Sequence, residues 1–301
     1  MTRVNEKLGS GFKGLTVSLA LAAAIALPGM PAAAQQPVPE GGSGAMDAGG
    51  TATFADLATL ADRSDMVIRA QIRDSVAVEP ERAPGLAPGH VRLYIEARTQ
   101  ALLSGEAALG ESLAYLVDLP LNARGKAPKL KNREVLLFAD RVPGRPGFVQ
   151  LTGKGAQLDY SPALEARVTP LLQALAARDA PPAVTGVGDA LAVRGTLAGE
   201  SETQVFLTTA DRSPVSITVL RRPGQEPVWG VSWGEIIDSA ARPPRPESLR
   251  WYRLACALPP SLPSNTNLAR DAEARRLAEV DYEFVVTALG PCTRAITEAP
   301  S

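Results

Sequence analysis

Short apolar stretches with a period of two residues recur between residues 66 and 233, and most of them end near proline or glycine. The first stretch places Met66, Ile68, Ala70 and Ile72 at every second position. Such alternation is typical of β-strands that bury one face. The chain contains 26 prolines and 26 glycines, and these residues form the turns between strands. The pattern therefore limits the chain to a fold built largely from short strands.

The first half of the chain is expected to hold five strands between two helices. The strands are predicted at residues 66–72, 91–97, 112–118, 134–140 and 147–152. Apolar residues at helical spacing over residues 54–61 predict a short helix capped by Thr53. A second helix is expected over residues 164–175, with Pro162 in its first turn. Pro170 lies inside this second helix and is expected to kink or split it.

The second half repeats the alternation after a proline-containing break at residues 179–184. Its strands are predicted at residues 189–196, 203–209, 214–221 and 227–233. A helix is expected over residues 247–258, with Pro246 in its first turn. The clearest helical pattern covers residues 268–289 and ends at Gly290. The apolar face of this helix is predicted to consist of Leu277, Val280, Phe284 and Ala288.

These elements predict an α+β fold made of two small domains. The first domain, residues 53–180, is expected to be a five-strand antiparallel sheet or a partly open barrel with flanking helices. The second domain, residues 185–295, is expected to be a four-strand antiparallel sheet with two helices. Residues 296–301 would form a tail.

Residues 1–34 have the three parts of a secretory signal peptide. Cations precede the apolar run Leu15–Leu27, and small residues follow it up to Ala34, after which we expect cleavage. The alternative is an N-terminal membrane anchor, but the run is shorter than the roughly 20 residues that a spanning helix needs. We therefore expect a periplasmic or secreted protein without a transmembrane segment. Residues 35–52, rich in glycine, proline and alanine, would be a flexible leader.

Export makes a disulfide bond between the two cysteines plausible. Cys256 and Cys292 are the only thiols of the chain, and an oxidising compartment tends to pair them. A disulfide between them would close a loop that spans 36 positions. In the chain-entropy model such a bond would stabilise the fold by about 3–4 kcal/mol. A catalytic or metal-binding role is disfavoured, because the chain has no CxxC motif and only one histidine.

The balance of charge excludes some classes of partner. The 31 basic and 32 acidic residues nearly cancel, so net charge would not attract a polyanion such as nucleic acid. The most distinctive local feature is a basic loop at residues 124–133, which could meet an anionic envelope ligand or simply be soluble surface. Its cations are Arg124, Lys126, Lys129, Lys131 and Arg133.

The sequence offers no complete nucleophilic site. Residues 230–234 match the GxSxG pattern of hydrolases around Ser232. No histidine follows Ser232, because the only histidine of the chain is His90, far upstream. We therefore interpret the segment as a strand with Trp229, Val231 and Trp233 on one face. No catalytic residue, metal site or cofactor is predicted.

Two further groups of residues are candidates for binding or chemistry. The first consists of carboxylates that could converge at one end of the second sheet, namely Glu200, Glu202, Glu235 and Asp238. Paired carboxylates could hydrolyse a glycosidic bond or bind Ca²⁺, but most turn acids are only solvated. The second group comprises Trp229, Trp233 and Trp251. These would form the core or line an apolar, carbohydrate-stacking pocket with Arg250 and Arg253 at its rim.

The first half of the chain resembles a module of uncharacterised exported proteobacterial proteins. The likeness is carried by the segments ADRSDMVIRAQI, VRLYIEARTQALLSG and REVLLFAD in this order. Over residues 65–153 it resembles the five-stranded barrel that binds oligonucleotides or oligosaccharides. This chain differs by having a Pro/Lys loop in place of a helix between the third and fourth strands.

The resemblance implies no activity, so function is argued from the residues. We expect a non-catalytic exported binding or interaction protein of the cell envelope. Its partner would be an anionic envelope ligand or another envelope protein. The alternatives are a carboxylate-dependent hydrolase of envelope polymer and a purely structural envelope component.

Overall fold

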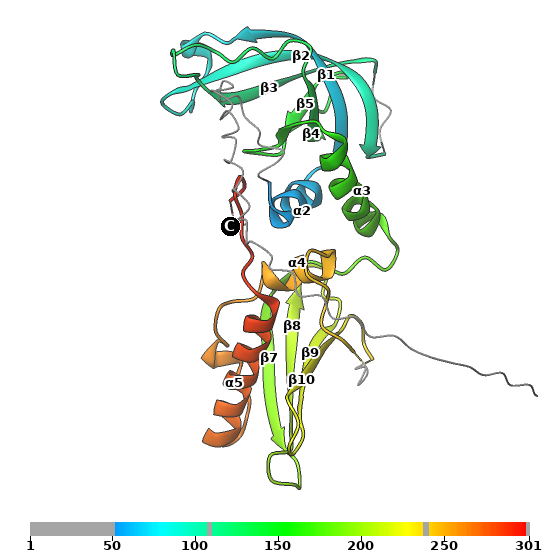
Figure 1. Ribbon diagram of the computed structural model, residues 1–301, viewed down its shortest axis with the longest axis vertical. Helices are drawn as coiled ribbons and strands as arrows, with labels where there is room; N and C mark the ends of the chain where they lie inside the picture. The colour runs from blue at the N-terminus through cyan, green and yellow to red at the C-terminus, as the bar shows by residue number, and fades with distance from the viewer. Residues whose placement is uncertain (1–51, 107–109, 237–240, 299–301) are drawn as a thin grey trace, which may run out of the picture. The chain divides into compact units, whose positions relative to one another are not determined.

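The computed structural model describes residues 52–106, 110–236 and 241–298. The predicted signal peptide and nearly all of the predicted leader lie outside this part, although Ala52 at the leader's end is buried. The described residues form an α+β fold, in which a nearly closed five-strand antiparallel barrel is followed by a four-strand antiparallel sheet (Figure 1). None of their four α-helices is long and apolar enough to cross a membrane.

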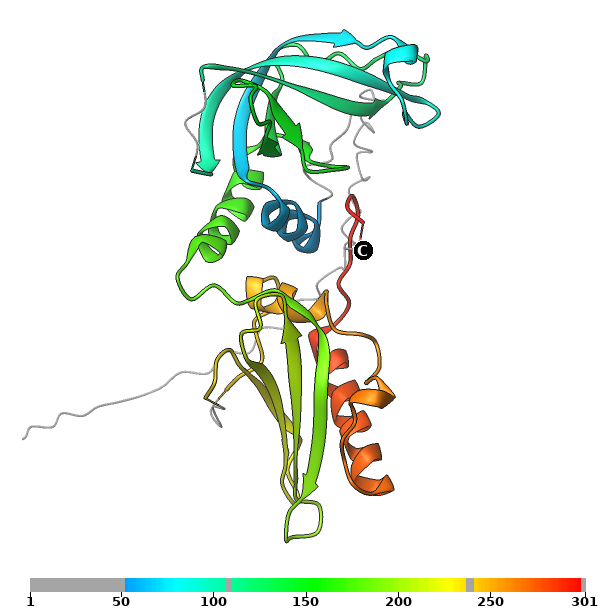
Figure 2. The same ribbon diagram turned by 180° about the vertical axis from the view of Figure 1, so that it is seen from behind.

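Five strands wind into the barrel. They are β1 (Met66–Ala77), β2 (His90–Ser104), β3 (Ser112–Pro120), β4 (Glu134–Arg141) and β5 (Val149–Leu151). They pair in the order β3-β2-β1-β4-β5. The two ends of this order meet at a parallel bridge between Ala114 and Phe148, where the N–H of Ala114 donates to the carbonyl of Gly147 over 2.8 Å. The strands therefore surround a common interior (Figures 1 and 2).

The alternation seen in the sequence fills this interior with apolar side chains. The apolar residues of the alternating pattern in β1 and β2 are buried there, with Met66, Ile68, Leu93 and Ile95 among them, except that Val91 at the start of β2 is only half-buried. Leu130, from the loop between β3 and β4, also enters this cluster. The loop thus contributes a side chain to the barrel core at the place where the barrel that the sequence resembles has a helix.

A short strand, β6 (Gln157–Asp159), was not predicted from the sequence. β6 pairs with residues 135–137 of β4, whereas β5 pairs with residues 139–141 of the same strand. Three residues are too few for alternation to be recognised. The other strands of the barrel were predicted correctly.

The helices beside the barrel differ in how well the sequence predicts them. α2 (Phe54–Arg63) begins with the predicted cap, since Thr53 and Asp56 exchange hydrogen bonds in a capping box. α3 (Pro162–Ala176) runs through Pro170 unbroken, so the expected split is wrong. Apolar side chains on both sides of the proline, including Val168 and Leu171, are buried in one core, so both parts of the helix are stabilised by the same packing.

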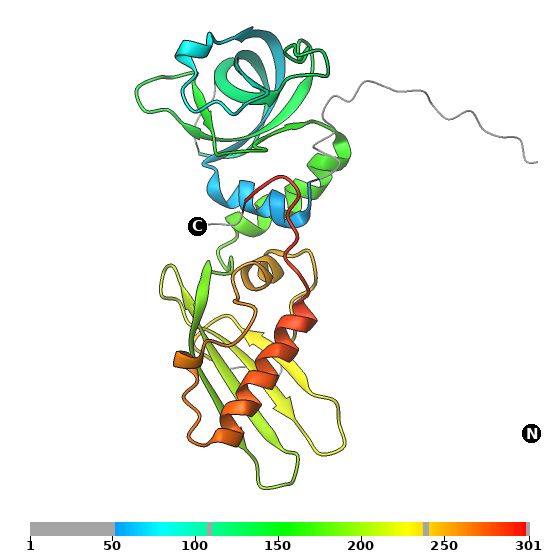
Figure 3. The same cartoon turned by 90° about the vertical axis from the view of Figure 1, so that its left-hand side faces the viewer.

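The second sheet consists of four strands joined in sequence. They are β7 (Val184–Arg194), β8 (Ser201–Thr209), β9 (Val215–Arg221) and β10 (Val228–Ser232), and they lie in the order β10-β9-β8-β7. α5 (Ala272–Leu289) crosses one face of this sheet (Figure 3). Val205, Ile217 and Val231 share that face and are buried. These four strands were also predicted.

The two helices that follow the sheet require two corrections. α4 (Leu249–Ala255) is capped by Ser248, so Pro246 precedes the helix and does not lie in its first turn. A serine hydroxyl can accept the orphan N–H of Trp251, which proline at the start cannot do. α5 begins at Ala272 after the cap Asp271, four residues later than expected.

The buried face of α5 also differs from the predicted one. Val280 is 43% exposed and Ala288 is exposed, whereas Asp281 is fully buried. The carboxylate of Asp281 accepts hydrogen bonds from Thr203 Oγ1 and from Arg221 Nε, the latter over 2.6 Å. These partners compensate the burial of its charge. The helix therefore turns the face with Ala278, Asp281 and Tyr282 towards the sheet.

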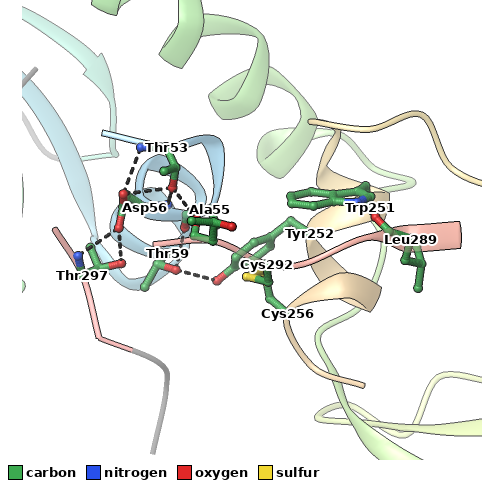
Figure 4. The surroundings of a disulfide bond; sticks show 11 residues. Thr53, Ala55, Asp56, Thr59, Trp251, Tyr252, Cys256, Leu289, Cys292 and Thr297 are labelled. Carbon is green, nitrogen blue, oxygen red and sulfur yellow. Dashed lines mark hydrogen bonds between the residues drawn. A yellow bond between two sulfur atoms is a disulfide. The ribbon is translucent and has the colours of Figure 1, made fainter. Parts of the chain in front are cut away.

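The predicted disulfide is confirmed and lies where the last segment of the chain meets the first helix. Cys256, at the end of α4, is bonded to Cys292, just past α5. Beyond it, residues 295–297 donate backbone hydrogen bonds to the carboxylate of Asp56 in α2, and Figure 4 shows Thr297 beside this carboxylate. Thr59 of α2 and Tyr252 of α4 share a hydrogen bond of 3.2 Å. The disulfide thus fixes α4 beside the segment that completes the N-terminus of α2.

Candidate functional site

An exposed apolar row crosses three strands on the outside of the barrel. The register pairs Val76 of β1 with Tyr94 of β2, and Tyr94 with Leu116 of β3. Directly paired residues point to the same side of a sheet. Val76 is 56% exposed and Leu116 is 51% exposed. Large apolar side chains in a contiguous exposed row are typical of interaction surfaces.

A β-bulge brings Val76 into this row. Met66 to Ile72 follow an even-numbered inward pattern, but the pairing with β2 shifts between Ile72 and Asp74. One extra residue in a strand moves all following side chains to the opposite face. Ser75 consequently lies opposite the buried Ile95, and Val76 lies opposite the outward Tyr94.

Phe148 extends the row from the turn between β4 and β5. Gly147, with φ of 85°, precedes it, and Ala114 of β3 pairs with Phe148 in the parallel bridge. The rings of Tyr94 and Phe148 lie with their centroids 6.3 Å apart and their planes at 49°. Phe148 remains 38% exposed. We call this surface, with Val76, Tyr94, Leu116 and Phe148 at its centre, the barrel face.

Charged residues border the barrel face on both sides. On one side, Arg92 and Asp118 form a bidentate ion pair with distances of 2.6 and 2.7 Å. Hydrogen bonding from Arg92 lowers the pKa of Asp118, and the charge of the guanidinium contributes in the same direction. On the other side, Asp74 of β1 lies opposite Glu96 of β2, and both are exposed. These four residues contribute three carboxylates and one guanidinium group to the border.

The barrel face combines apolar ring surface with hydrogen-bonding groups. Within the part of the chain that the structure describes, no three His, Cys, Asp or Glu side chains are grouped so that they could hold a metal ion. Tyr94 and Phe148 provide apolar ring surface, and Arg92 with its neighbouring carboxylates provides hydrogen-bonding groups. Such a combination fixes the orientation of a bound molecule.

The structure places the predicted basic loop between β3 and β4. Arg124, Lys126, Lys129 and Lys131 are exposed. Arg133 is different, because its guanidinium forms an ion pair with Asp159 of β6. Four of the five predicted cations therefore remain available to solvent.

The predicted tryptophans do not form one pocket. Trp229 and Trp251 are buried in the core, and Nε1 of Trp251 donates to the carbonyl of Leu289 over 2.8 Å. Trp233 is half-buried and lines a pocket of about 1040 Å³ together with Arg250. The other expected rim residue, Arg253, instead binds both carboxylate oxygens of Asp62 at 2.6 and 2.8 Å.

The predicted carboxylates are not brought together. Glu200 lies in the turn before β8 and Glu202 near the start of β8, whereas Glu235 follows the end of β10. The start of β8 pairs with the end of β9, and the start of β9 pairs with the end of β10. Glu235 thus lies at the opposite end of the sheet from the other two. Asp238 is outside the described residues.

Ser232 of the GxSxG segment and His90 lie in two different sheets. Ser232 is a buried residue at the end of β10, paired with Ser216 of β9. This confirms the interpretation of the GxSxG segment as a strand. His90 begins β2 of the barrel, and its Nδ1 lies 3.1 Å from the carbonyl oxygen of Pro88.

The barrel face was not among the sites predicted from the sequence. A signal was present, because Tyr94 and Leu116 are apolar at positions whose neighbours on the same face are charged. Val76 and Phe148 gave no such signal, because the bulge in β1 and the turn between β4 and β5 bring them to this surface. No protein-family model matches the chain, and no curated protein matches it either.

Proposed function

We propose that this chain is a non-catalytic binding protein of the cell envelope and that its barrel face holds an uncharged oligosaccharide. The observation that carries the proposal is the exposed row of Val76, Tyr94 and Leu116, continued by the ring of Phe148. Sugar rings have apolar faces that pack on aromatic and aliphatic side chains, while their hydroxyl groups need polar partners.

The position of this row on the barrel supports the proposal. Five-stranded barrels that bind oligonucleotides and oligosaccharides hold their ligands on the face of strands two and three, between the loops after strands one and four. Here Tyr94 lies on β2, Leu116 lies on β3, and Phe148 ends the loop after β4. The likeness concerns the fold, so the choice of ligand rests on the side chains.

The charges around the row favour a neutral ligand. Asp74, Glu96 and Asp118 would repel the phosphates of a nucleic acid, and only Asp118 is neutralised by a neighbouring arginine. The same carboxylates can accept hydrogen bonds from sugar hydroxyl groups. An uncharged glycan therefore fits the barrel face better than a polyanion.

Docking of another envelope protein is the second candidate function. It is favoured by Val76 and Leu116, which are aliphatic and more than half exposed. The centres of protein interfaces are enriched in apolar side chains and depleted of charge. Neither the hydrolase nor the purely structural role has a comparable observation in its favour.

Location in the envelope is part of the proposal. It rests on the signal-peptide pattern of residues 1–34 and is supported by the disulfide between Cys256 and Cys292. Disulfides persist in oxidising compartments and are rare in the cytosol.

The test is binding of the mature chain to an array of neutral and acidic oligosaccharides. Tyr94→Ala combined with Phe148→Ala should abolish binding to the neutral oligosaccharides, because removal of a stacking ring costs about 1–3 kcal/mol in comparable sites. Phe206→Ala is the matched control, since Phe206 is a similarly exposed ring on β8. Binding that survives the double substitution would contradict the proposal. Capture of an envelope protein that requires Val76 and Leu116, without glycan binding, would establish the second candidate.

A further inference from the structure

A pocket of about 1040 Å³ lies at the end of β10, away from the barrel face. The end of α3 and the segment after it form one wall, including Ala177 and Pro181. Trp233 and Glu235 also line it, together with residues 241–245 and 248–250. Pockets that hold small molecules span roughly 300–1000 Å³, so the space is sufficient for one or two sugar rings.

The aromatic element of this pocket is Trp233. The guanidinium of Arg250 lies 5.9 Å from the centre of the indole ring, within the range of a cation–π contact. Trp233 is half-buried, whereas the other two tryptophans are buried in the core. A flat molecule can therefore reach this indole while meeting a fixed positive charge beside it.

Three arginines are among the described residues that line the pocket. Arg242, Arg245 and Arg250 are exposed, and none of them forms an ion pair within the described residues. Two carboxylates, Asp179 and Glu235, are among the described lining residues. Positive charge is thus in excess among these described residues, in contrast to the carboxylates at the border of the barrel face.

The arginines belong to a segment with restricted backbone freedom. Pro243 and Pro244 separate Arg242 from Arg245, and Pro246 follows. Proline fixes φ near −65°, and a backbone that is already ordered loses less entropy when a ligand binds. The hydroxyl of Ser248 also donates to the carbonyl of Arg245 over 2.6 Å. The guanidinium groups are therefore attached to a preorganised chain.

We propose that this pocket binds an anionic sugar, with its ring on Trp233 and its carboxylate or phosphate on Arg245 and Arg250. Guanidinium groups bind both anions through paired, charge-assisted hydrogen bonds. The inference stands apart from the proposed function, because it concerns a different surface and a ligand of different charge. No bond forms or breaks in this binding event.

Tryptophan fluorescence provides the test. Glucuronic acid and glucose 6-phosphate, each titrated into the mature chain, should give a saturable change, and glucose should give none. The two anions distinguish a carboxylate from a phosphate source. Trp233→Phe should remove the signal, because the other two indoles are buried. The affinity should also fall as ionic strength rises.

The variants separate the pocket from general charge effects. Arg245→Ala and Arg250→Ala should each weaken binding at least about tenfold, which corresponds to the loss of a charge-assisted hydrogen bond. Arg222→Ala, an exposed arginine beyond β9, is the matched control and should bind normally. The proposal is overturned if neither anion gives a saturable change, if glucose binds equally well, or if Arg222→Ala causes the same loss. Tyr94→Ala, a substitution in the barrel face, should leave the binding of both anions to the pocket unchanged. The test of the pocket is therefore independent of the test of the barrel face.

Discussion

The barrel buries its inward side chains against one another, whereas the four-strand sheet buries one face against helices. The barrel cluster draws on its own strands and on Leu130. The second cluster combines the sheet with α2, α3, α4 and α5, and it includes Val67 and Phe138 from the outer surface of the barrel. The barrel thus has a core of its own, while the sheet depends on residues from both halves of the chain.

The largest effect is expected where the two regions meet. Phe138→Ala should destabilise the protein by about 3–5 kcal/mol, because it removes a fully buried ring from the cluster that contains the sheet. Hydrogen exchange should show the loss of protection in α2, α3 and the sheet. Ile95→Ala, inside the barrel, is the control and should reduce protection in the barrel strands. The same exchange pattern in both variants would show that the two clusters unfold as one.

Removal of the disulfide should have the next largest effect. Cys256→Ser combined with Cys292→Ser should lower the free energy of unfolding by about 3–4 kcal/mol in the chain-entropy model. Urea denaturation measures the loss. The barrel strands should keep their hydrogen-exchange protection, since both cysteines lie outside them. A barrel that loses protection equally would remove the distinction between the two regions.

Asp56 should make the contact between α2 and residues 295–297 sensitive to acid. Burial alone would raise the pKa of Asp56, but hydrogen bonds from Thr297, Ala295 and Thr53 lower it well below the ordinary 3.8. The stabilisation is therefore present above pH 3.8 and is lost as the pH falls from 3.8 towards the lower pKa of the folded state.

The measurement is urea denaturation of Asp56→Asn and the unmodified chain from neutral to acidic pH. The variant should be less stable at neutral pH by about 2–3 kcal/mol, because an amide leaves N–H donors without a charged acceptor. The difference between the two proteins should narrow in acid. A difference that stays constant below pH 3.8 would contradict the assigned role of Asp56.

The smallest effect is expected from the ion pair between Arg253 and Asp62. Arg253 of α4 is largely buried and binds Asp62 of α2 in a bidentate manner. A double-mutant cycle with Arg253→Ala and Asp62→Ala should give a coupling of about 1 kcal/mol. Arg194 and Glu273, an exposed pair between β7 and α5, serve as the comparison and should couple more weakly.

Much of the fold could be predicted because its strands obey simple local patterns. The inward residues from Met66 to Ile72, the cap at Thr53 and the pairing of the two cysteines were all evident in the sequence. Each depends on a period, a cap or a pair that short segments reveal. Partners far along the chain are not encoded in such patterns.

Several of the wrong or missing predictions depend on contacts or pairings that local patterns do not show. Asp281 is buried because Arg221 and Thr203, distant in sequence, satisfy its carboxylate. The barrel face depends on a bulge after Ile72 and on a turn that brings Phe148 beside β3. The acidic residues failed to meet because Glu235 follows the far end of a strand, which only the register shows.

The contact between Asp56 and residues 295–297 also constrains the order in which the fold can be completed. The partners are separated by about 240 positions, so their contact closes a loop that contains both sheets. Folding rates fall as contacting residues lie further apart in the chain. We therefore expect the N-terminus of α2 to acquire its last hydrogen bonds late in folding, after the strands between the two partners have paired.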